Sequence, residues 1–305
     1  MKFFCLALMF LNTLAFSAPK TKIWSEILEE AVSDKGEVDY VWIKKNSTKL
    51  NEFITSFSSV SPEKWNEQEK KSHYINFYNA SMIFNLLKYA QNSKIDVGSN
   101  AFLDIVINKI SVSGGNIWNG TYKVNIAGVD VNLDEIEHGL IRGKILKTKT
   151  NWHLKKLDPR VHAALNCAAI SCPVLSNKAF QAETVDRKLD ELFINWLGEE
   201  YQFKKLGSSF RINKIVKWYF EDFESYEAPS SWRSCSGGKY TKGSGNYLCH
   251  YLDLSNASNK SWKKKMFSTL NSRSALYNPF NGISFEYDWH INSKRQMMSY
   301  INKLK

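Results

Sequence analysis

The chain has 305 residues, of which 43% are hydrophobic and 23% are charged, and this composition excludes a largely disordered protein. The length allows one or two domains. The net charge of +11 comes mostly from scattered lysines and not from a basic module with aromatic platforms, so we expect no specific nucleic-acid partner.

The amino-terminal residues have the pattern of a secretory signal peptide. Lys2 precedes an apolar run at 3–11, and Ala15-Phe16-Ser17 fits the small-x-small cleavage pattern. The run is too short to span a bilayer, which takes about 20 apolar residues. We therefore expect a signal peptide at 1–17, an exported protein that is periplasmic or secreted, and no membrane span.

Four cysteines remain after cleavage: Cys167, Cys172, Cys235 and Cys249. In an oxidising compartment an even number permits two disulfides. Cys235 and Cys249 flank a segment rich in Gly, Ser and Lys, so we predict a disulfide that closes this loop. For Cys167 and Cys172 three possibilities stay open: a disulfide between them, burial as reduced residues, or a chemical role.

The first half of the chain predicts mostly helices. Residues 23–33 have helical spacing, and 36–40 have the pattern of a turn into a short strand. Ser61-Pro62-Glu63 predicts the start of a long helix that runs to about residue 90. Asn76 and Asn79 lie at the start of its apolar stripe, so two amides are expected to face the core.

Residues 116–127 predict a strand that ends in a tight turn at Ala127-Gly128. Asn132, with an acid three residues later, predicts the start of a helix. Glu137 lies within the apolar stripe of that helix. His138 lies four residues after Asp134, at the spacing of a surface pair.

The second half alternates between element types. Residues 160–166 predict a strand with His162 on its more polar face, and helices are expected at 184–202 and 213–223. The composition of 224–280 predicts an irregular insertion, and a strand closes the chain at 283–289.

Helices mixed with hairpin-like strands, without regular βαβ alternation, predict an α+β fold with an antiparallel sheet. No linker rich in Pro or Gly divides the chain. We therefore predict a single domain at 18–305 with an irregular C-terminal insertion.

Seven sequence blocks occur in a fixed order: VDY (38–40), YINFYNA (74–80), IEHGLIR (136–142), DPRVHAALNC (158–167), SCPVL (171–175), KWYFEDF (217–223) and YDWHIN (287–292). In this order they resemble the family named domain of unknown function 547, over 36–223 and 283–292. The resemblance implies no assigned activity. It suggests a distant kinship with papain-like and transglutaminase-like cysteine enzymes. Two departures are Ala168, where family members often carry Gly, and the length of the insertion.

The blocks contain every group that a cysteine-dependent enzyme needs. Cys167 or Cys172 is the candidate nucleophile, His162 the base, and Asn79 or Glu137 the residue that orients the imidazole. This set predicts an amide hydrolase or acyl transferase whose substrate is a small molecule, a peptide or a cell-envelope component. Because His162 and Cys167 would face opposite sides of an ideal strand, the chain must turn between them.

Each of these residues also has a structural interpretation. A buried Asn79 could satisfy backbone groups, Glu137 could pair with Arg160 or Arg142, and His162 could be a hydrogen-bonded core histidine. The transglutaminase-like resemblance places Asn79 where a nucleophilic cysteine belongs, and an amide cannot attack a carbonyl. On this alternative the same pocket belongs to a non-catalytic binding or scaffolding domain.

A zinc site built from Glu137, His138, His162 and Cys167 is a weaker alternative, since the chain has neither HExxH nor repeated CxxC. A Walker loop, GxGxxG, GxSxG and SxxK are also absent from the sequence. We therefore expect no metal, no nucleotide cofactor and no serine-hydrolase chemistry.

Overall fold

The computed structural model describes residues 18–144, 150–255, 260–277 and 282–293. The predicted signal peptide, 1–17, lies outside the described residues. The α-helices are Thr21–Ala31 (α1), Tyr40–Lys45 (α2), Ser47–Thr55 (α3), Glu67–Asn92 (α4), Asn100–Leu103 (α5), Val185–Gly198 (α6), Ile215–Trp218 (α7), Phe220–Glu224 (α8), Ser244–Leu254 (α9) and Lys260–Ser268 (α10). The strands are Ser111–Val112 (β1), Gly115–Asn116 (β2), Val124–Ile126 (β3), Val129–Val131 (β4), Phe203–Leu206 (β5), Ser209–Asn213 (β6) and Ile283–Glu286 (β7).

Short helices of other types connect these elements. The 3₁₀ helices are Ser56–Ser59 (η1), Pro62–Lys64 (η2), Ile107–Lys109 (η3), Thr150–Trp152 (η5), Pro159–Ala163 (η6), Ala182–Thr184 (η7) and Arg273–Leu276 (η8). One π-helix, Glu135–Ile141 (η4), completes the set in the described part of the chain. Together they form an α+β fold, as the sequence predicts.

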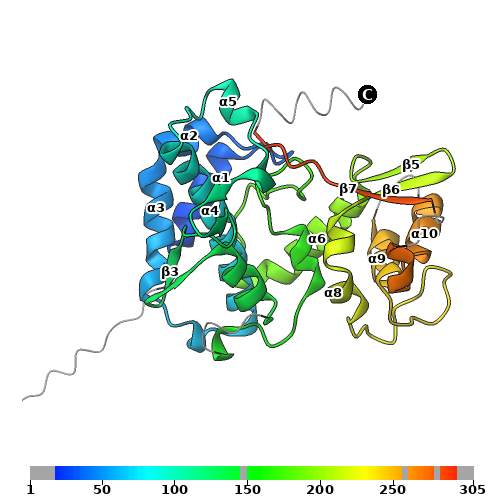
Figure 1. Ribbon diagram of the computed structural model, residues 1–305. Helices are drawn as coiled ribbons and strands as arrows, with labels where there is room; N and C mark the ends of the chain where they lie inside the picture. Colours follow the sequence, from blue (N-terminus) through cyan, green and yellow to red (C-terminus); the bar gives the residue numbers. More distant parts are fainter. Residues whose placement is uncertain (1–17, 145–149, 256–259, 278–281, 294–305) are drawn as a thin grey trace, which may run out of the picture.

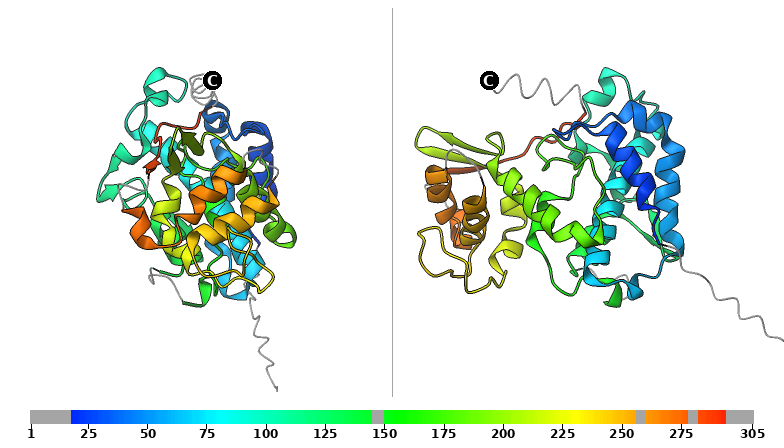
Figure 2. Two further views of the ribbon diagram at one scale, coloured as in Figure 1. Left: turned by 90° about the vertical axis from the view of Figure 1, so that its right-hand side faces the viewer. Right: turned by 180° about the vertical axis from the view of Figure 1, so that it is seen from behind.

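Two hydrophobic clusters organise the molecule. The first surrounds α4 and includes α1 to α3, while the second lies among β5, β6, α9 and α10. Figures 1 and 2 show the blue and cyan helices of the first cluster on one side and the yellow and orange elements of the second on the other. Helix α6 contributes to both, since Leu189 packs in the first cluster and Phe193 in the second.

Helix α4 is the central element of the first cluster. Asn66 caps it, because its side chain accepts from the Glu69 amide and the Glu69 carboxylate accepts from the Asn66 amide. The capped helix begins at residue 67 and not at 61 as predicted, since Pro62–Lys64 forms a separate 3₁₀ turn. Within it Phe77 is fully buried and stacks on Phe57, with 4.2 Å between the ring centroids.

The described sheets are small. β1 pairs with β2 and β3 with β4, both antiparallel, and the β3–β4 turn at Ala127-Gly128 confirms the predicted tight turn. In the third sheet β5 and β6 are antiparallel, but β7 joins β6 in parallel, so the predicted antiparallel sheet is partly mixed.

The segment after β7 crosses from the second cluster to the first. β7 pairs with β6, and the chain then forms bridges from His290 to Val106, from Ile291 to Ala169 and from Ser293 to Val38. Figure 1 shows this segment in red, running across the molecule from β7 towards α5. It therefore ties together parts of the chain that are far apart in the sequence.

Several predicted elements differ from the structure. The predicted strand at 160–166 is wrong, because Asp158 caps a 3₁₀ helix that opens with Pro159. The strand predicted at 36–40 is wrong as well, since Val38 makes only isolated bridges and Tyr40 begins α2. The helix predicted at 213–223 is interrupted at Tyr219, which separates α7 from α8.

The insertion is more ordered than its composition predicts. It contains α9 and α10, whose buried side chains include Tyr247, Leu248 and Phe267. The Ser, Asn and Lys residues around these apolar positions obscure their helical spacing. The predicted disulfide between Cys235 and Cys249 is confirmed.

Candidate functional site

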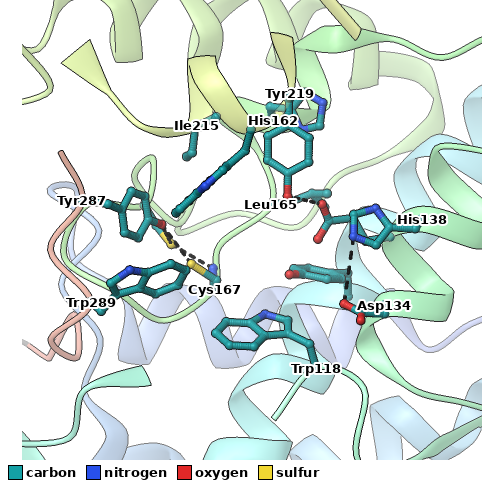
Figure 3. A pocket seen from close by; sticks show the side chains of 14 residues that line it. Trp118, Asp134, His138, His162, Leu165, Cys167, Ile215, Tyr219, Tyr287 and Trp289 are labelled. Atoms are coloured by element: carbon teal, nitrogen blue, oxygen red, sulfur yellow. Dashed lines mark hydrogen bonds and ion pairs between the residues drawn. The ribbon is translucent and has the colours of Figure 1, made fainter. Parts of the chain in front are cut away.

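A cavity of about 310 Å³ opens between the two clusters. Its aromatic lining residues are Tyr78, Trp118, Trp218, Tyr219, Tyr287 and Trp289. Its polar and sulfur-bearing lining residues are Asp134, Glu137, His138, His162, Cys167 and Cys172. Figure 3 shows Cys167 and Tyr287 on one side of this pocket and His138 and Asp134 on the opposite side. Four of the five predicted site residues therefore line one cavity, and the fifth, Asn79, does not.

Asn79 holds the backbone of the loop that carries the cysteines. Its side-chain nitrogen donates to the Ala164 carbonyl at 2.9 Å, and its oxygen accepts from the Asn166 amide at 2.8 Å. The buried Asn166 side chain in turn accepts from the Ala168 amide and donates to the Pro173 carbonyl. The structural interpretation of Asn79 therefore agrees with its contacts, and the chain turns near Asn166 as the enzyme hypothesis requires.

Ala168 sits in this turn with a φ of +63°. That conformation is costly for a residue with a Cβ atom, and glycine adopts it freely. The turn thus explains why glycine suits this position, where the resemblance leads one to expect it.

The two sulfur atoms share one hydroxyl group. Cys167 and Cys172 are both unpaired, and each Sγ lies 3.0 Å from the Tyr287 hydroxyl. The Cys167 amide also donates to the Cys172 Sγ at 2.9 Å. Because Tyr287 follows β7, the C-terminal segment supplies the group that joins the two thiols.

These contacts separate the acidities of the two thiols. Burial and the hydrogen bond with Cys172 raise the pKa of the Cys167 thiol. Burial would also raise the pKa of Cys172, but hydrogen bonds from the Cys167 side chain, from Tyr287 and from the Ala169 backbone lower it. The pair therefore favours a thiolate on Cys172 and a proton on Cys167.

His162 is bound to a carboxylate and not to a sulfur. Its Nε2 lies 2.9 Å from Asp222 Oδ2, and its ring stacks on Tyr219 with centroids 3.8 Å apart. Burial lowers the pKa of His162, although Asp222 opposes that effect. Among the described residues neither sulfur is hydrogen-bonded to an imidazole. His162 therefore has the contacts of the core histidine that the sequence left as its alternative.

Asp222 is a site residue that the sequence analysis missed. Besides His162, it accepts from Arg142 Nε at 2.7 Å and from Lys144 Nζ at 2.8 Å. Burial would raise the pKa of Asp222, but its bonds from His162 and Arg142 hold it far below the usual range. Its position in the KWYFEDF block was the only signal in the sequence.

Glu137 and His138 face the pocket from the π-helix. Glu137 accepts from the Tyr219 hydroxyl at 2.5 Å. His138 Nδ1 lies 2.6 Å from Arg142 Nη1, which can only donate, and His138 Nε2 lies 4.0 Å from Asp134. A neutral His138 therefore carries its proton on Nε2.

The alternative ion pair between Glu137 and Arg160 is wrong. Arg160 instead bonds to Asp158, Asp186 and Asp190. The surface pair of His138 with Asp134 has the predicted partners, at the 4.0 Å limit of an ion pair.

The zinc alternative finds no support in the geometry. Across residues 18–144, 150–255, 260–277 and 282–293, no group of three or more His, Cys, Asp or Glu side chains is arranged to hold a metal ion. None of the helices in these residues is long and apolar enough to cross a membrane.

A search of family models matches residues 62–197 to the family described as "Protein of unknown function, DUF547". This match covers less than half of the chain. The match confirms the resemblance inferred from the sequence blocks, over a shorter segment. No curated protein and no solved structure matches the chain. The DUF547 segment contains both thiols, but Trp218, Tyr219, Tyr287 and Trp289 lie beyond it.

Proposed function

We propose that this chain is a thiol-dependent enzyme that cleaves or transfers acyl groups, an amide hydrolase or an acyl transferase. One observation carries the proposal: two unpaired cysteines line a single cavity, and one tyrosine hydroxyl bonds to both sulfurs. A cysteine nucleophile requires a thiolate and a nearby group that exchanges its proton. Here the second thiol takes the place that the sequence analysis gave to His162.

The reaction can proceed with the proton held between the two sulfurs. Cys167 passes its proton to the Cys172 thiolate and attacks the substrate carbonyl through Sγ. The C–N bond breaks, the amine leaves with the proton from Cys172, and a thioester remains on Cys167. Water then attacks the thioester and gives a proton to Cys172, which returns it to Cys167 as the carboxylic acid leaves. In a transferase a second amine replaces the water.

His138 is the candidate hydrogen-bond donor from the opposite wall. Its side chain is 28% exposed, whereas that of His162 is 1% exposed. Because Arg142 occupies Nδ1, the Nε2 proton is the one that can turn from Asp134, 4.0 Å away, to a polarised oxygen of the substrate. A substrate between Cys167 and His138 would contact both groups, as their places in Figure 3 indicate.

The test combines thiol labelling with turnover. The chain from residue 18 onwards should contain two free thiols. Iodoacetamide should label Cys167 before Cys172, because Cys167 is partly exposed and Cys172, although its thiol is the more acidic, is buried. A panel of fluorogenic amides should identify a substrate, and Cys167→Ser should abolish its turnover while leaving the folded structure intact. Unchanged turnover in Cys167→Ser would disprove this assignment.

The second candidate is a non-catalytic binding domain that uses the same pocket. The observation that favours it is that, within the described residues, no imidazole bonds to either sulfur. If the pocket binds ligands but the protein hydrolyses none of the fluorogenic amides, this alternative is favoured.

We also propose that the protein is exported. The amino-terminal pattern at 1–17 and the Cys235–Cys249 disulfide support an oxidising destination. Sequencing the amino terminus of the protein from its native host should find Ala18 as the first residue. A first residue of Met1 in the cytosolic fraction would contradict the proposal.

A further inference from the structure

The pocket differs in charge from the chain that forms it. The chain carries +11, but the lining residues include Asp134 and Glu137 and, among the described residues, neither lysine nor arginine. Arg142 and Lys144, which follow the π-helix, are both paired with Asp222. The surface that a ligand would meet is therefore negative in a basic protein.

Four aromatic rings form a continuous wall of this pocket. Trp289 contacts Trp118, Trp218 and Tyr287, with centroid distances of 5.6, 5.3 and 4.4 Å. Trp218 and Tyr287 also contact each other at 4.9 Å. Figure 3 shows Trp118, Trp289 and Tyr287 around one side of the cavity. Trp218 is 40% exposed, which is a large exposure for an indole ring.

Aromatic faces attract cations because the ring quadrupole is negative above and below the plane. Two of the lining rings already hold cations from residues that do not line the pocket. The Arg142 guanidinium carbon lies 4.9 Å from the Tyr219 centroid, and Lys214 Nζ lies 5.6 Å from the Trp218 centroid. The rings of the wall can act on a ligand in the same way.

The carboxylates lie across the pocket from Tyr287 and Trp289, and the Asp134 amide donates to the Trp118 carbonyl. Glu137 accepts from the Tyr219 hydroxyl, and Asp134 is 30% exposed beside His138. Burial raises the pKa of Asp134, so its charged form would gain from a positive neighbour. A cation in the cavity would be attracted by the rings on one side and by this carboxylate on the other.

We propose that the pocket binds an organic cation, an alkylammonium or methylated ammonium group, between the aromatic wall and Asp134. The volume of about 310 Å³ lies at the lower end for ligand pockets, and it suits one such group with a short chain. This inference rests on the proposed function in one respect: it takes the cation to be part of the substrate on which Cys167 acts. Two sources share this chemistry: a free quaternary amine and a lysine side chain of a peptide.

The first experiment compares cations with neutral molecules of the same shape. Choline is titrated against 3,3-dimethylbutan-1-ol, and Nα-acetyl-lysine amide against Nα-acetyl-norleucine amide, with tryptophan fluorescence or calorimetry as the readout. In at least one pair the cation should bind about 10-fold more tightly than its neutral counterpart. The pair that shows the preference identifies the source. Equal affinities in both pairs would overturn the inference.

Variants then assign the binding to the pocket. Trp218→Leu should weaken cation binding about 10-fold, and Trp218→Phe should retain most of it because a ring remains. Asp134→Asn should weaken cation binding selectively. The matched control is Asp104→Asn, which removes the same charge at an exposed position outside the pocket. Equal effects of the two aspartate variants would count against the pocket.

The two proposals fail in different ways. Cation binding should persist in Cys167→Ser, since the sulfur is not part of the cation site. Cation selectivity without turnover would overturn the enzyme proposal alone. Turnover of neutral amides without cation selectivity would overturn this inference alone.

Discussion

The two hydrophobic clusters differ in how they are built. The first packs around the single long helix α4, within and beside the DUF547 segment, whereas the second uses a small mixed sheet, short helices and a disulfide. The pocket needs both, because its thiols come from the first cluster while Tyr287 packs against the two clusters together. A domain match alone therefore locates the sulfurs but not the surface around them.

The largest expected effect comes from opening the first cluster. Phe77→Ala should lower the free energy of unfolding by about 3–5 kcal/mol, because it leaves a cavity beside Phe57. Phe267→Ala in the second cluster should also destabilise the protein. Since α6 packs in both clusters, we expect each variant to show one shared transition in urea, by circular dichroism and by fluorescence. Two separate transitions would show that the clusters unfold independently.

Asp222→Asn tests the charge that links the clusters. Asp222 lies on α8, and its partners Arg142 and His162 lie 80 and 60 residues earlier in the chain. Removing one partner of a buried ion pair costs about 3–5 kcal/mol. The matched control is Asp190→Asn, an exposed partner of Arg160, which should cost less than about 1 kcal/mol. Equal losses in the two variants, measured by urea unfolding, would contradict the role of Asp222.

The disulfide should affect mainly the second cluster. Its cysteines are 14 residues apart, and a loop of that length is stabilised by about 3 kcal/mol in the chain-entropy account. We expect the double variant Cys235→Ser and Cys249→Ser to be less stable and to be cleaved by protease first in the segment between them. A cleavage pattern identical to that of the wild type would show that the loop does not depend on the bridge.

The smallest expected effect is a loss of stability at acid pH, and it arises within the first cluster. Burial would raise the pKa of Asp158, but Arg160 and Lys71 lower it to about 2. Because the folded pKa lies below that of the unfolded chain, the stabilisation is complete above about pH 4 and is lost as the pH falls towards 2. It amounts to about 2 kcal/mol.

Asp158→Asn should remove this component. Urea unfolding between pH 5 and pH 2 should then show a difference between wild type and variant that shrinks as the pH falls. A difference that stays constant over this range would contradict the assignment.

The sequence predicted the features that local patterns determine. The capped helix after Asn132, the turn at Ala127-Gly128 and the disulfide around a polar loop all follow from neighbouring residues. The apparent strand at 160–166 failed because alternating apolar residues mask a turn that Asp158 caps and Pro159 begins. Hydrophobic periodicity predicts which faces of an element are apolar, but it gives no information about a helix cap of this kind.

The walls and the partners of the site could not be predicted in the same way. Tyr287 reaches Cys167 over 120 residues, and Asp222 reaches His162 over 60. Nothing in the local sequence specifies such pairings, because they depend on how the two clusters dock. The blocks KWYFEDF and YDWHIN carried these residues, and only the folded chain shows that they meet.

The crossing segment after β7 has a consequence for the order of events during synthesis. A nascent chain that has emerged only as far as residue 282 contains the whole DUF547 segment and both thiols, but it lacks Tyr287 and Trp289. The sulfurs of such a chain would lack the Tyr287 hydroxyl between them, and the pocket would lack the Trp289 indole. Both thiols are therefore synthesised well before Tyr287 and Trp289. The cavity around the thiols is completed only near the end of elongation.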